Sequence, residues 1–569
     1  LDKTSTSMGG RNLRRWIEKP LMDIGDIHKR LQAVKELKEN VILRSDISET
    51  LKKVYDIERL TGKIAYGSVN ARDMISLKTS LMQLPALKEL MKDRSSDLLK
   101  ELYDELDVLE DVAKLIEDAI VDDPPVSVKE GGIIKSTYDE EVNKLRTAST
   151  EGKNWVIAIE SKEREATGIK NLKVGYNKVF GYYLEVSKSF VNMVPDRFIR
   201  KQTLSTGERY ITDELKEIES TILGAQDKVV NLEYEIFTKI REKIATQIER
   251  LQMSSNAVAT IDTLCSFAEV ADVNSYVMPE VDESNDIIIK DGRHPVVERL
   301  IDSGSFVPND TFLNTTEDRI NIITGPNMAG KSTYMRQVAQ IVLMAQIGSF
   351  VPASSAKIGI VDRIFTRVGA SDDLSTGQST FMVEMNEVAN IVLNATPRSL
   401  LILDEIGRGT STFDGLSIAW AVVEYISKTE KVGARTLFAT HYHELTELED
   451  KLDGVKNYCI AVKEKGEDVI FLRKIIRGGA DESYGIYVAK LAGIPNVIIK
   501  RANEILNGLK EGSYAISQVR ENKNIKNVSQ VDFYNYKLGE IENELQKIDV
   551  NELTPIDALN ILVKMKSKL

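Results

Sequence analysis

The stretch Ile320–Ser332, INIITGPNMAGKS, decides the fold of the second half of this chain. Ile320–Thr324 is an apolar, β-branched run typical of a buried strand, and Gly325–Ser332 fits the phosphate-loop pattern GxxxxGK[ST]. A helical pattern follows at Thr333–Ala345. A strand, a glycine-rich loop and a helix in this order predict a nucleotide-binding α/β fold, in which backbone N–H groups surround the phosphates.

Each residue type in the loop has a chemical reason. The glycines allow close approach of the backbone, Lys331 is placed to reach the β- and γ-phosphates of ATP, and the Ser332 hydroxyl is placed to ligate Mg²⁺. A chance glycine-rich turn is the alternative, and the flanking strand and helix disfavour it. The predicted ATP-binding residues of the loop are Gly325, Pro326, Asn327, Met328, Ala329, Gly330, Lys331, Ser332 and Thr333.

Two further buried-type strands, Leu400–Leu403 and Arg435–Thr440, alternate with helices and predict a mainly parallel sheet flanked by helices. Asp404, at the end of the first, suits the metal, directly or through a water. Glu405 suits orienting or deprotonating the attacking water. His441 follows the other strand and fits either a contact to the γ-phosphate or water, or a structural hydrogen bond. His443 is the weaker candidate.

The first half of the chain has a different pattern. Asp26–Ile120 reads as helical, with an amphipathic stripe along Leu99–Ile120. Asn171–Ser187 is rich in β-branched and aromatic residues and predicts short strands. Helical spacing then resumes at Thr212 and continues to Leu251, which predicts one helix of about forty residues and roughly 60 Å. A β-rich insert between two long helical stretches suggests a tip on a pair of levers.

Composition limits the class of protein. A length of 569 residues exceeds one hydrophobic core, and 75 basic against 87 acidic residues give −12, which excludes a histone-like nucleic-acid binder. Two cysteines exclude a disulfide framework, four histidines lack zinc spacing, and no apolar run approaches the roughly 20 residues of a spanning helix. The chain opens with Leu1-Asp2, so we expect a piece of a longer protein.

Four ordered motifs resemble the ATPase of MutS-type DNA mismatch-repair proteins. They are TGPNMAGKSTYMRQ (Thr324–Gln337), STFMVEM (Ser379–Met385), DEIGRGTSTFDG (Asp404–Gly415) and ATH (Ala439–His441). Three other segments are similar to the family's helical core, clamp and start of the ATPase: Leu1–Ile17, Asn171–Val186 and Gly292–Glu298. The resemblance therefore extends over nearly the whole chain.

The resemblance implies an ABC-type ATPase whose two nucleotide sites are completed across a homodimer. Ser379 would contact the γ-phosphate of the partner's ATP, Asn327 would add a phosphate contact, and Phe306 would stack on adenine. A core role for Phe306 remains the alternative. LSTGQ at Leu374–Gln378 also reads like a transporter signature, which would favour Ser375 over Ser379. The family register favours Ser379, because the residues that follow it match too.

The resemblance also implies that the β-rich segment is a DNA clamp. Lys170–Arg209 carries eight basic and three acidic residues, a net charge of +5 against −12 for the whole chain. Such a tip can contact the backbone of double-stranded DNA without reading sequence, and a merely solvated basic surface is the alternative. The predicted DNA-contacting residues are Lys173, Lys178, Arg200 and Lys201.

Further partners are also implied by the resemblance. Gln530, Phe533 and Tyr534 are similar to the peptide with which bacterial repair proteins bind the replicative sliding clamp, unless they begin a helix that packs on the tail. Leu553–Leu569 resembles the family's C-terminal helices, which implies tetramers. MutL would be a partner, and we expect a bacterial cytoplasmic protein, nucleoid-associated on DNA, with no membrane.

The expected fold is multidomain α plus α/β. The expected domains are a helical core and lever (1–167 and 212–280), a clamp (168–211), an ATPase and dimerisation domain (281–510), a linker (511–529) and a helical oligomerisation tail (530–569). The family's mismatch-reading and connector domains would precede Leu1, so we expect mismatch reading to be missing. Two alternatives remain: a MutS paralogue acting on recombination intermediates, and the ATPase subunit of a transporter.

Overall fold

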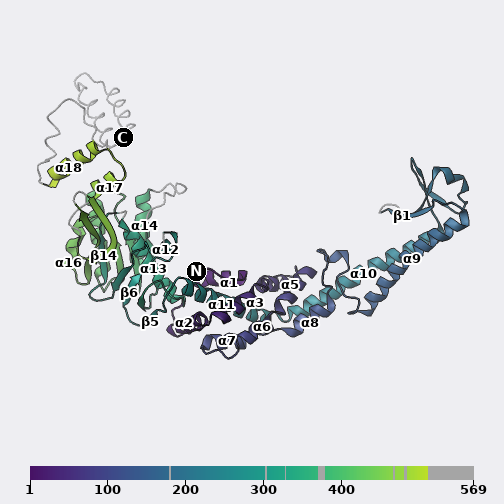
Figure 1. Cartoon of the computed structure of the whole chain (residues 1–569), viewed down its shortest axis with the longest axis horizontal. Helices are drawn as coiled ribbons and strands as arrows, with labels where there is room; N and C mark the ends of the chain where they lie inside the picture. Colours follow the sequence, from purple (N-terminus) through teal and green to yellow (C-terminus); the bar gives the residue numbers. More distant parts are fainter. Residues whose placement is uncertain are drawn as a thin grey trace, which may run out of the picture. The chain divides into compact units, whose positions relative to one another are not determined.

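The computed structural model describes residues 1–177, 181–301, 304–326, 329–368, 379–465, 468–479 and 484–510. The chain divides into two compact units, Leu1–Ser483 and Tyr484–Leu569. The described part of the larger unit contains a helical bundle, a pair of long helices with a small sheet, and an α/β region (Figure 1).

The bundle forms around α11 (Ile248–Val273). Most side chains of α11 are buried, among them Leu264 and Phe267, and a helix that is apolar on all sides belongs inside a core. Asp262 of α11 accepts the backbone N–H groups of Ser5 and Thr6 at 2.8 Å, which fixes the first helix on it. The surrounding helices are α1 (Ser7–Glu18), α2 (Ile24–Glu39), α3 (Val41–Leu51), α4 (Ile57–Ala65), α5 (Ala71–Leu81), α6 (Leu84–Leu90), α7 (Asp97–Glu105) and α8 (Glu110–Ala119).

The apolar stripe of Leu99–Ile120 belongs to two helices, α7 and α8, so the expectation of one continuous amphipathic stretch is wrong. The chain breaks at Leu106–Leu109, where Leu109 has a φ of 50°. Arg250 of α11 holds the break with ion pairs to Asp107 and Asp111 at 2.7 and 2.9 Å. Because Arg250 lies far along the chain, helical spacing alone gave no sign of this break.

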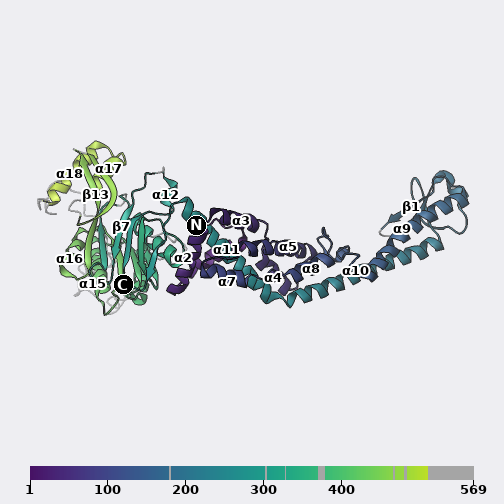
Figure 2. The ribbon, with the colours of Figure 1, turned by 60° about the horizontal axis from the view of Figure 1, so that its bottom comes forward.

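Two long helices, α9 (Glu140–Thr167) and α10 (Asp213–Ala245), lie side by side (Figures 1 and 2). The Thr212 side chain caps α10 by accepting the N–H of Leu215. The prediction of one helix from Thr212 to Leu251 is wrong, because α10 ends at Ala245 and α11 begins at Ile248. The 33 residues of α10 span about 50 Å rather than about 60 Å.

A small antiparallel sheet lies between these two helices in sequence. Its strand order is β1-β2-β4-β3, and its buried core includes Leu184, Val186 and Tyr210 together with Ile159 of α9 and Leu215 of α10. The sheet is therefore anchored to both long helices. Its strands are β1 (Lys173–Asn177), β2 (Gly181–Ser187), β3 (Ile199–Thr203) and β4 (Gly207–Ile211), with a 3₁₀ helix, η2 (Lys188–Met193), after β2.

The α/β region contains a six-stranded sheet of order β10-β11-β12-β8-β13-β14. Adjacent strands are parallel except for the antiparallel hairpin of β13 and β14. The strands are β8 (Ile320–Thr324), β10 (Ile364–Arg367), β11 (Leu400–Asp404), β12 (Arg435–Ala439), β13 (Val455–Lys465) and β14 (Asp468–Arg477). The helices are α12 (Val297–Leu300), α13 (Lys331–Gln346), α14 (Thr380–Asn394), α15 (Thr412–Ser427) and α16 (Leu448–Lys451), with a 3₁₀ helix, η4 (His443–Glu447), before α16.

Both faces of this sheet are buried, as the apolar strands predict. Alternate side chains of β11 enter different cores: Leu400 and Ile402 join the core shared with α13 and the bundle, whereas Leu401 and Leu403 join the one beneath α15. A second sheet of order β5-β9-β6-β7 extends the first core. Its strands are β5 (Glu280–Asp282), β6 (Ile287–Gly292), β7 (Asn309–Leu313) and β9 (Ser355–Gly359).

The described part of the smaller unit consists of α17 (Gly485–Leu491) and α18 (Asn496–Lys510). The predicted linker at 511–529 and the tail at 530–569 lie outside the described residues. Within the described part of the chain, no helix is long and apolar enough to cross a membrane.

Candidate functional site

Three predicted motifs meet at one edge of the six-stranded sheet. β12 lies between β11 and β8, and the register pairs Ala439 with both Asp404 and Ile323. Parallel strands in this register end at the same level, so the phosphate loop, the Asp404-Glu405 pair and His441 follow neighbouring strand ends. The carboxyl edge of parallel strands is where α/β folds place ligands.

The phosphate loop leads directly into α13. Gly330 has a φ of 106°, a left-handed conformation that favours glycine, and it caps the helix. The Lys331 side chain is only 1% exposed, and its ammonium donates to the carbonyl oxygen of Gly325. Burial lowers the pKa of Lys331, while Glu405 and Asp404 oppose that shift. The predicted contacts Asn327 and Met328 lie outside the described residues, and Pro326 and Ala329 flank them.

Asp404 and Ser332 supply oxygen ligands that fit Mg²⁺. Asp404 is 7% exposed, and its Oδ1 atom has no hydrogen-bond partner among the described residues. Burial raises the pKa of Asp404, although a hydrogen bond with Ser332 opposes the shift. A buried carboxylate oxygen without a partner suits a hard cation. No cluster of three His, Cys, Asp or Glu residues that could hold a metal ion lies in the described ranges.

Glu405 and His441 lie beside this pair. Glu405 has a φ of 55°, rare for a residue other than glycine, and its carboxylate pairs with Arg408. The His441 ring lies over the Tyr442 ring, with centroids 4.1 Å apart. Partial burial lowers the pKa of His441, Arg408 and Lys331 act in the same direction, and Glu405 opposes them. His443 begins the short helix η4.

Phe306 lines a small pocket next to the start of α13. The pocket has a volume of about 150 Å³ and includes Gly330 and Thr333 from the loop side. Sequence reasoning missed the lining residues Tyr334, Gln337 and Arg473. Tyr334 and Gln337 lie four and seven residues after Gly330, so a helical-face argument could have found them. Arg473 comes from β14, and no local pattern in the sequence indicates it.

Ser379 lies at the exposed start of α14. Its side chain accepts the N–H of Met382 at 3.2 Å and thereby caps the helix. The preceding residues 369–378, including Ser375, lie outside the described residues. The register of the trans contact, Ser375 or Ser379, therefore stays a prediction.

Comparison with known proteins identifies the family. Residues 1–268 match MutS domain III, and residues 321–510 match MutS domain V. DNA mismatch repair protein MutS of Clostridium kluyveri is 53% identical over 580 residues, which cover 100% of this chain and 67% of that protein. This chain belongs to the MutS family. The DNA mismatch repair proteins MutS of Acetivibrio thermocellus and Ruminiclostridium cellulolyticum are each 62% identical to it. Each match covers 100% of this chain and 66% of the relative's length.

Three of the four predicted DNA-contacting residues lie on described strands of the small sheet of this MutS family member. Lys173 lies on edge strand β1, while Arg200 and Lys201 lie on the opposite edge strand β3, and all three are exposed. Lys178 lies outside the described residues. Three basic residues of the segment form ion pairs: Arg197 with Glu163 of α9, Arg209 with Glu185, and Arg200 with Glu208 at 3.5 Å. Glu185 and Glu208 are already counted in the +5, so only Glu163, outside the segment, lowers this charge, to +4.

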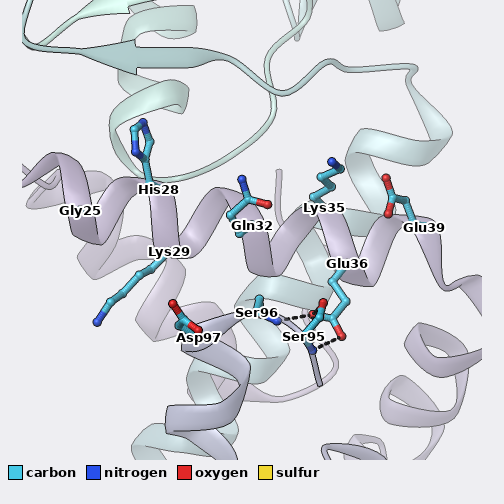
Figure 3. Close-up of a pocket in the computed structure, with 10 residues that line it drawn as sticks. All are labelled: Gly25, His28, Lys29, Gln32, Lys35, Glu36, Glu39, Ser95, Ser96 and Asp97. Atoms are coloured by element: carbon cyan, nitrogen blue, oxygen red, sulfur yellow. Dashed lines mark hydrogen bonds between the residues drawn. The ribbon is translucent and has the colours of Figure 1, made fainter. Parts of the chain in front are cut away.

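The remaining predicted residues are not described, and one charged pocket lies in the helical bundle, apart from the residues of the nucleotide site. Gln530, Phe533 and Tyr534 lie outside the described residues. A pocket of about 400 Å³ lies between α2 and the segment before α7 (Figure 3). There Glu36 accepts the N–H groups of Ser95 and Ser96 at 3.0 and 2.7 Å, in place of a side-chain cap for α7. The hydrogen bonds of Glu36 in this pocket therefore join α2 to the start of α7 within the helical bundle.

Proposed function

We propose that this chain is the ATP-hydrolysing and DNA-clamping part of a DNA mismatch repair protein, with an ABC-type ATPase. One observation carries the proposal: Lys331, Ser332, Asp404, Glu405 and His441 follow three adjacent parallel strands at one edge of the sheet. Domain III and domain V matches, and relatives named as mismatch repair proteins, support the DNA role.

In this proposal each residue has one task. Lys331 and the N–H groups at the start of α13 hold the ATP phosphates, and Phe306 borders the base. Ser332 and Asp404 would hold Mg²⁺, which would supply positive charge to the ATP phosphates. Glu405 orients and deprotonates the attacking water. His441 donates from its neutral ring to the γ-phosphate or the water, and its lowered pKa supports that neutral form.

We also propose that two copies pair through the face that carries Ser379. Met382 on the first turn of α14 is 51% exposed, and Phe413 on the first turn of α15 is 82% exposed. Large apolar side chains exposed beside a functional edge are typical of an interaction surface. Ser379 would then cap the γ-phosphate of the partner's nucleotide, so that ATP binding favours pairing.

The expected domain limits are kept as part of the proposal: helical core and lever 1–167 and 212–280, clamp 168–211, ATPase 281–510, linker 511–529 and tail 530–569. The ends of α9 at Thr167 and of β4 at Ile211 support the clamp limits. Double-stranded DNA would lie against the clamp sheet. MutL, a replicative sliding clamp and a second dimer are the proposed protein partners, and the bacterial cytoplasm is the proposed location.

Release of phosphate from ATP tests the proposal directly. We expect the purified chain to hydrolyse ATP only with Mg²⁺, and the Lys331→Ala variant to lose more than about 100-fold of the rate. Lys451→Ala is the matched control, because Lys451 is a surface lysine of the same domain paired with Glu447. A wild-type chain without Mg²⁺-dependent hydrolysis, or an active Lys331→Ala variant, would overturn the ATPase.

A further inference from the structure

The backbone of Gly407 is held at both its N–H and its carbonyl oxygen by residues that no motif argument links to it. The carboxylate oxygen Oε1 of Glu384 accepts the Gly407 N–H at 2.6 Å. The hydroxyl of Tyr442 donates to the Gly407 carbonyl oxygen at 3.0 Å. Glu384 lies on α14, whereas Tyr442 follows β12. The backbone of this one residue therefore joins α14, the helix that Ser379 caps, to the strand end that carries His441.

The site leaves Gly407 little freedom to move. Its φ is 87°, and a Cβ atom at this position would lie 2.4 Å from the carbonyl oxygen of Gly415. On the other side, a Cβ atom at Gly415 would lie 2.2 Å from both the Gly407 oxygen and the Tyr442 hydroxyl. The Gly407 carbonyl is thus enclosed by backbone and by Tyr442. Because no empty space surrounds Gly407, a shift of Glu384 or Tyr442 also shifts the Gly407 backbone.

Glu384 is a buried charge with a fixed orientation. Its second oxygen lies 3.4 Å from Arg367 of β10, and both side chains are 4% exposed. Arg367 is held in turn by Glu387, one turn further along α14, at 3.0 Å. Burying such a pair costs desolvation energy that its attraction only partly returns. Its clearest structural effect here is to fix the oxygen that faces Gly407.

Glu405 lies two residues before Gly407 and has an unusual backbone. Its φ of 55° is unfavourable for a residue with a side chain, so the surrounding structure must hold it. On one side, the Glu405 N–H donates to the Ala439 carbonyl oxygen at 2.9 Å. On the other side, the Ile406 side chain is buried in the core beneath α15, and the Gly407 backbone is the next group held by hydrogen bonds. The direction of the Glu405 carboxylate therefore depends in part on where Gly407 is held.

We propose that Glu384 and Tyr442 are positioning residues for ATP hydrolysis, which orient Glu405 through the backbone of Gly407. The inference rests on the proposed ATPase function. It adds that the position of the Glu405 carboxylate depends on the position of α14, the helix that Ser379 caps. Movement of α14 when the two copies pair would thus reach Glu405 of the same chain through one hydrogen bond and two peptide links.

Single-turnover hydrolysis, with the whole chain in excess over ATP, separates the chemical step from nucleotide release. Tyr442→Phe removes only the hydroxyl. We expect its hydrolysis rate to fall about 10-fold with the dissociation constant for ATP unchanged. Tyr276→Phe is the matched control, because the Tyr276 hydroxyl also makes a 3.0 Å hydrogen bond, to Glu298 outside the site. The control should keep the wild-type rate.

Glu384→Gln and Glu384→Ala test the hydrogen bond to the Gly407 N–H. Glutamine keeps an oxygen that can accept the Gly407 N–H, so its rate should lie between those of wild type and Glu384→Ala. The double variant Tyr442→Phe/Glu384→Gln should lose less than the product of the two single losses, because both partners hold the backbone of one residue, Gly407.

Wild-type rates in Tyr442→Phe, or multiplicative losses in the double variant, would overturn the inference while the ATPase itself remains. A rate loss that follows only a lower melting temperature, and that the Tyr276→Phe control shares, would overturn it as well. Failure of the ATPase is distinct: wild type would then be inactive, and Lys331→Ala would not differ from it.

Discussion

The backbone N–H of Glu405 donates a hydrogen bond to the carbonyl oxygen of Ala439 at 2.9 Å. This bond continues the pairing of β11 with β12 by one residue, beyond the register pair Asp404 and Ala439. It therefore fixes the first residue after β11 against the strand that leads to His441. Glu405 and His441, the two residues proposed to act on the attacking water, are therefore joined through a backbone hydrogen bond at one edge of the sheet. This bond limits how far the two side chains can move apart.

Replacing Glu405 by glutamine should stop hydrolysis without stopping binding. The Glu405→Gln side chain keeps its size but cannot take a proton, so we expect the single-turnover rate to fall about 100- to 1,000-fold. Affinity for ATP, measured by nucleotide titration, should stay within about 2-fold. Glu447→Gln, at an exposed residue of the same domain, is the control. A comparable loss in the control would remove the assignment of Glu405.

Replacing Asp404 by asparagine should raise stability and abolish activity together. Burial raises the pKa of Asp404, so its ionised form is unfavourable in the fold at neutral pH when no cation is bound. Asp404→Asn removes that charge, and we expect the melting temperature without nucleotide to rise by roughly 1–2 °C. Mg²⁺-dependent hydrolysis should fall more than about 100-fold. A lower melting temperature of Asp404→Asn would show that the ionised Asp404 carboxylate does not destabilise the fold.

Stability should fall as the pH drops below about 6.5, in part because of His294. Its Nδ1 atom accepts the N–H groups of Val296 and Val297, and burial and Arg336 lower its pKa, with Glu298 opposing. The unfolded chain therefore takes up this proton first as the pH falls, and folding loses free energy below pH 6.5. His294→Asn keeps an acceptor but cannot titrate. Its melting temperature should fall less between about pH 7 and pH 5.5 than that of wild type, and equal losses would contradict the prediction.

DNA binding should depend on the basic residues at the two edges of the clamp sheet. We expect the triple variant Lys173→Glu, Arg200→Glu, Lys201→Glu to lose most of its affinity for a fully paired duplex at low salt. The slope of log affinity against log salt should shrink by about 0.9 for each phosphate contact removed. The control reverses three exposed lysines of the bundle: Lys52, Lys92 and Lys100. Equal losses in both triple variants would assign the effect to total charge.

The pair of long helices should depend on one buried carboxylate. Glu233 of α10 is 0% exposed, pairs with Arg146 of α9, and accepts the N–H of Ile133 at 2.8 Å. Glu233→Ala would leave the buried N–H of Ile133 and the partly exposed Arg146 without this acceptor, and we expect a loss of about 2 kcal/mol in unfolding free energy. Hydrogen exchange should rise along α9.

The control for this prediction is Glu214→Ala. Glu214 pairs with Lys162 across the same two helices, but both side chains are largely exposed. A solvated pair of this kind is worth less than about 1 kcal/mol. Similar losses from the two substitutions would contradict the dominant role of Glu233.

Much of the fold was predictable wherever the pattern is local. The strand Ile320–Thr324 and the helix after it form as the apolar run and the glycine-rich loop predict, although the helix begins at Lys331 rather than Thr333. The strand Leu400–Asp404 is likewise fully buried. The break between α10 and α11 was missed, because apolar spacing continues through Thr246 and Gln247 while the backbone does not.

The sequence by itself determined which chemistry this chain can carry, because a phosphate loop, a strand ending in two carboxylates and a strand ending in histidine are contiguous patterns. Only the tertiary structure decided which distant groups hold them. Glu384 meets Gly407 across 23 residues and Tyr442 meets it across 35, and Arg146 meets Glu233 across 87. Such contacts depend on how helices and strands pack in three dimensions, and spacing along the chain does not record it.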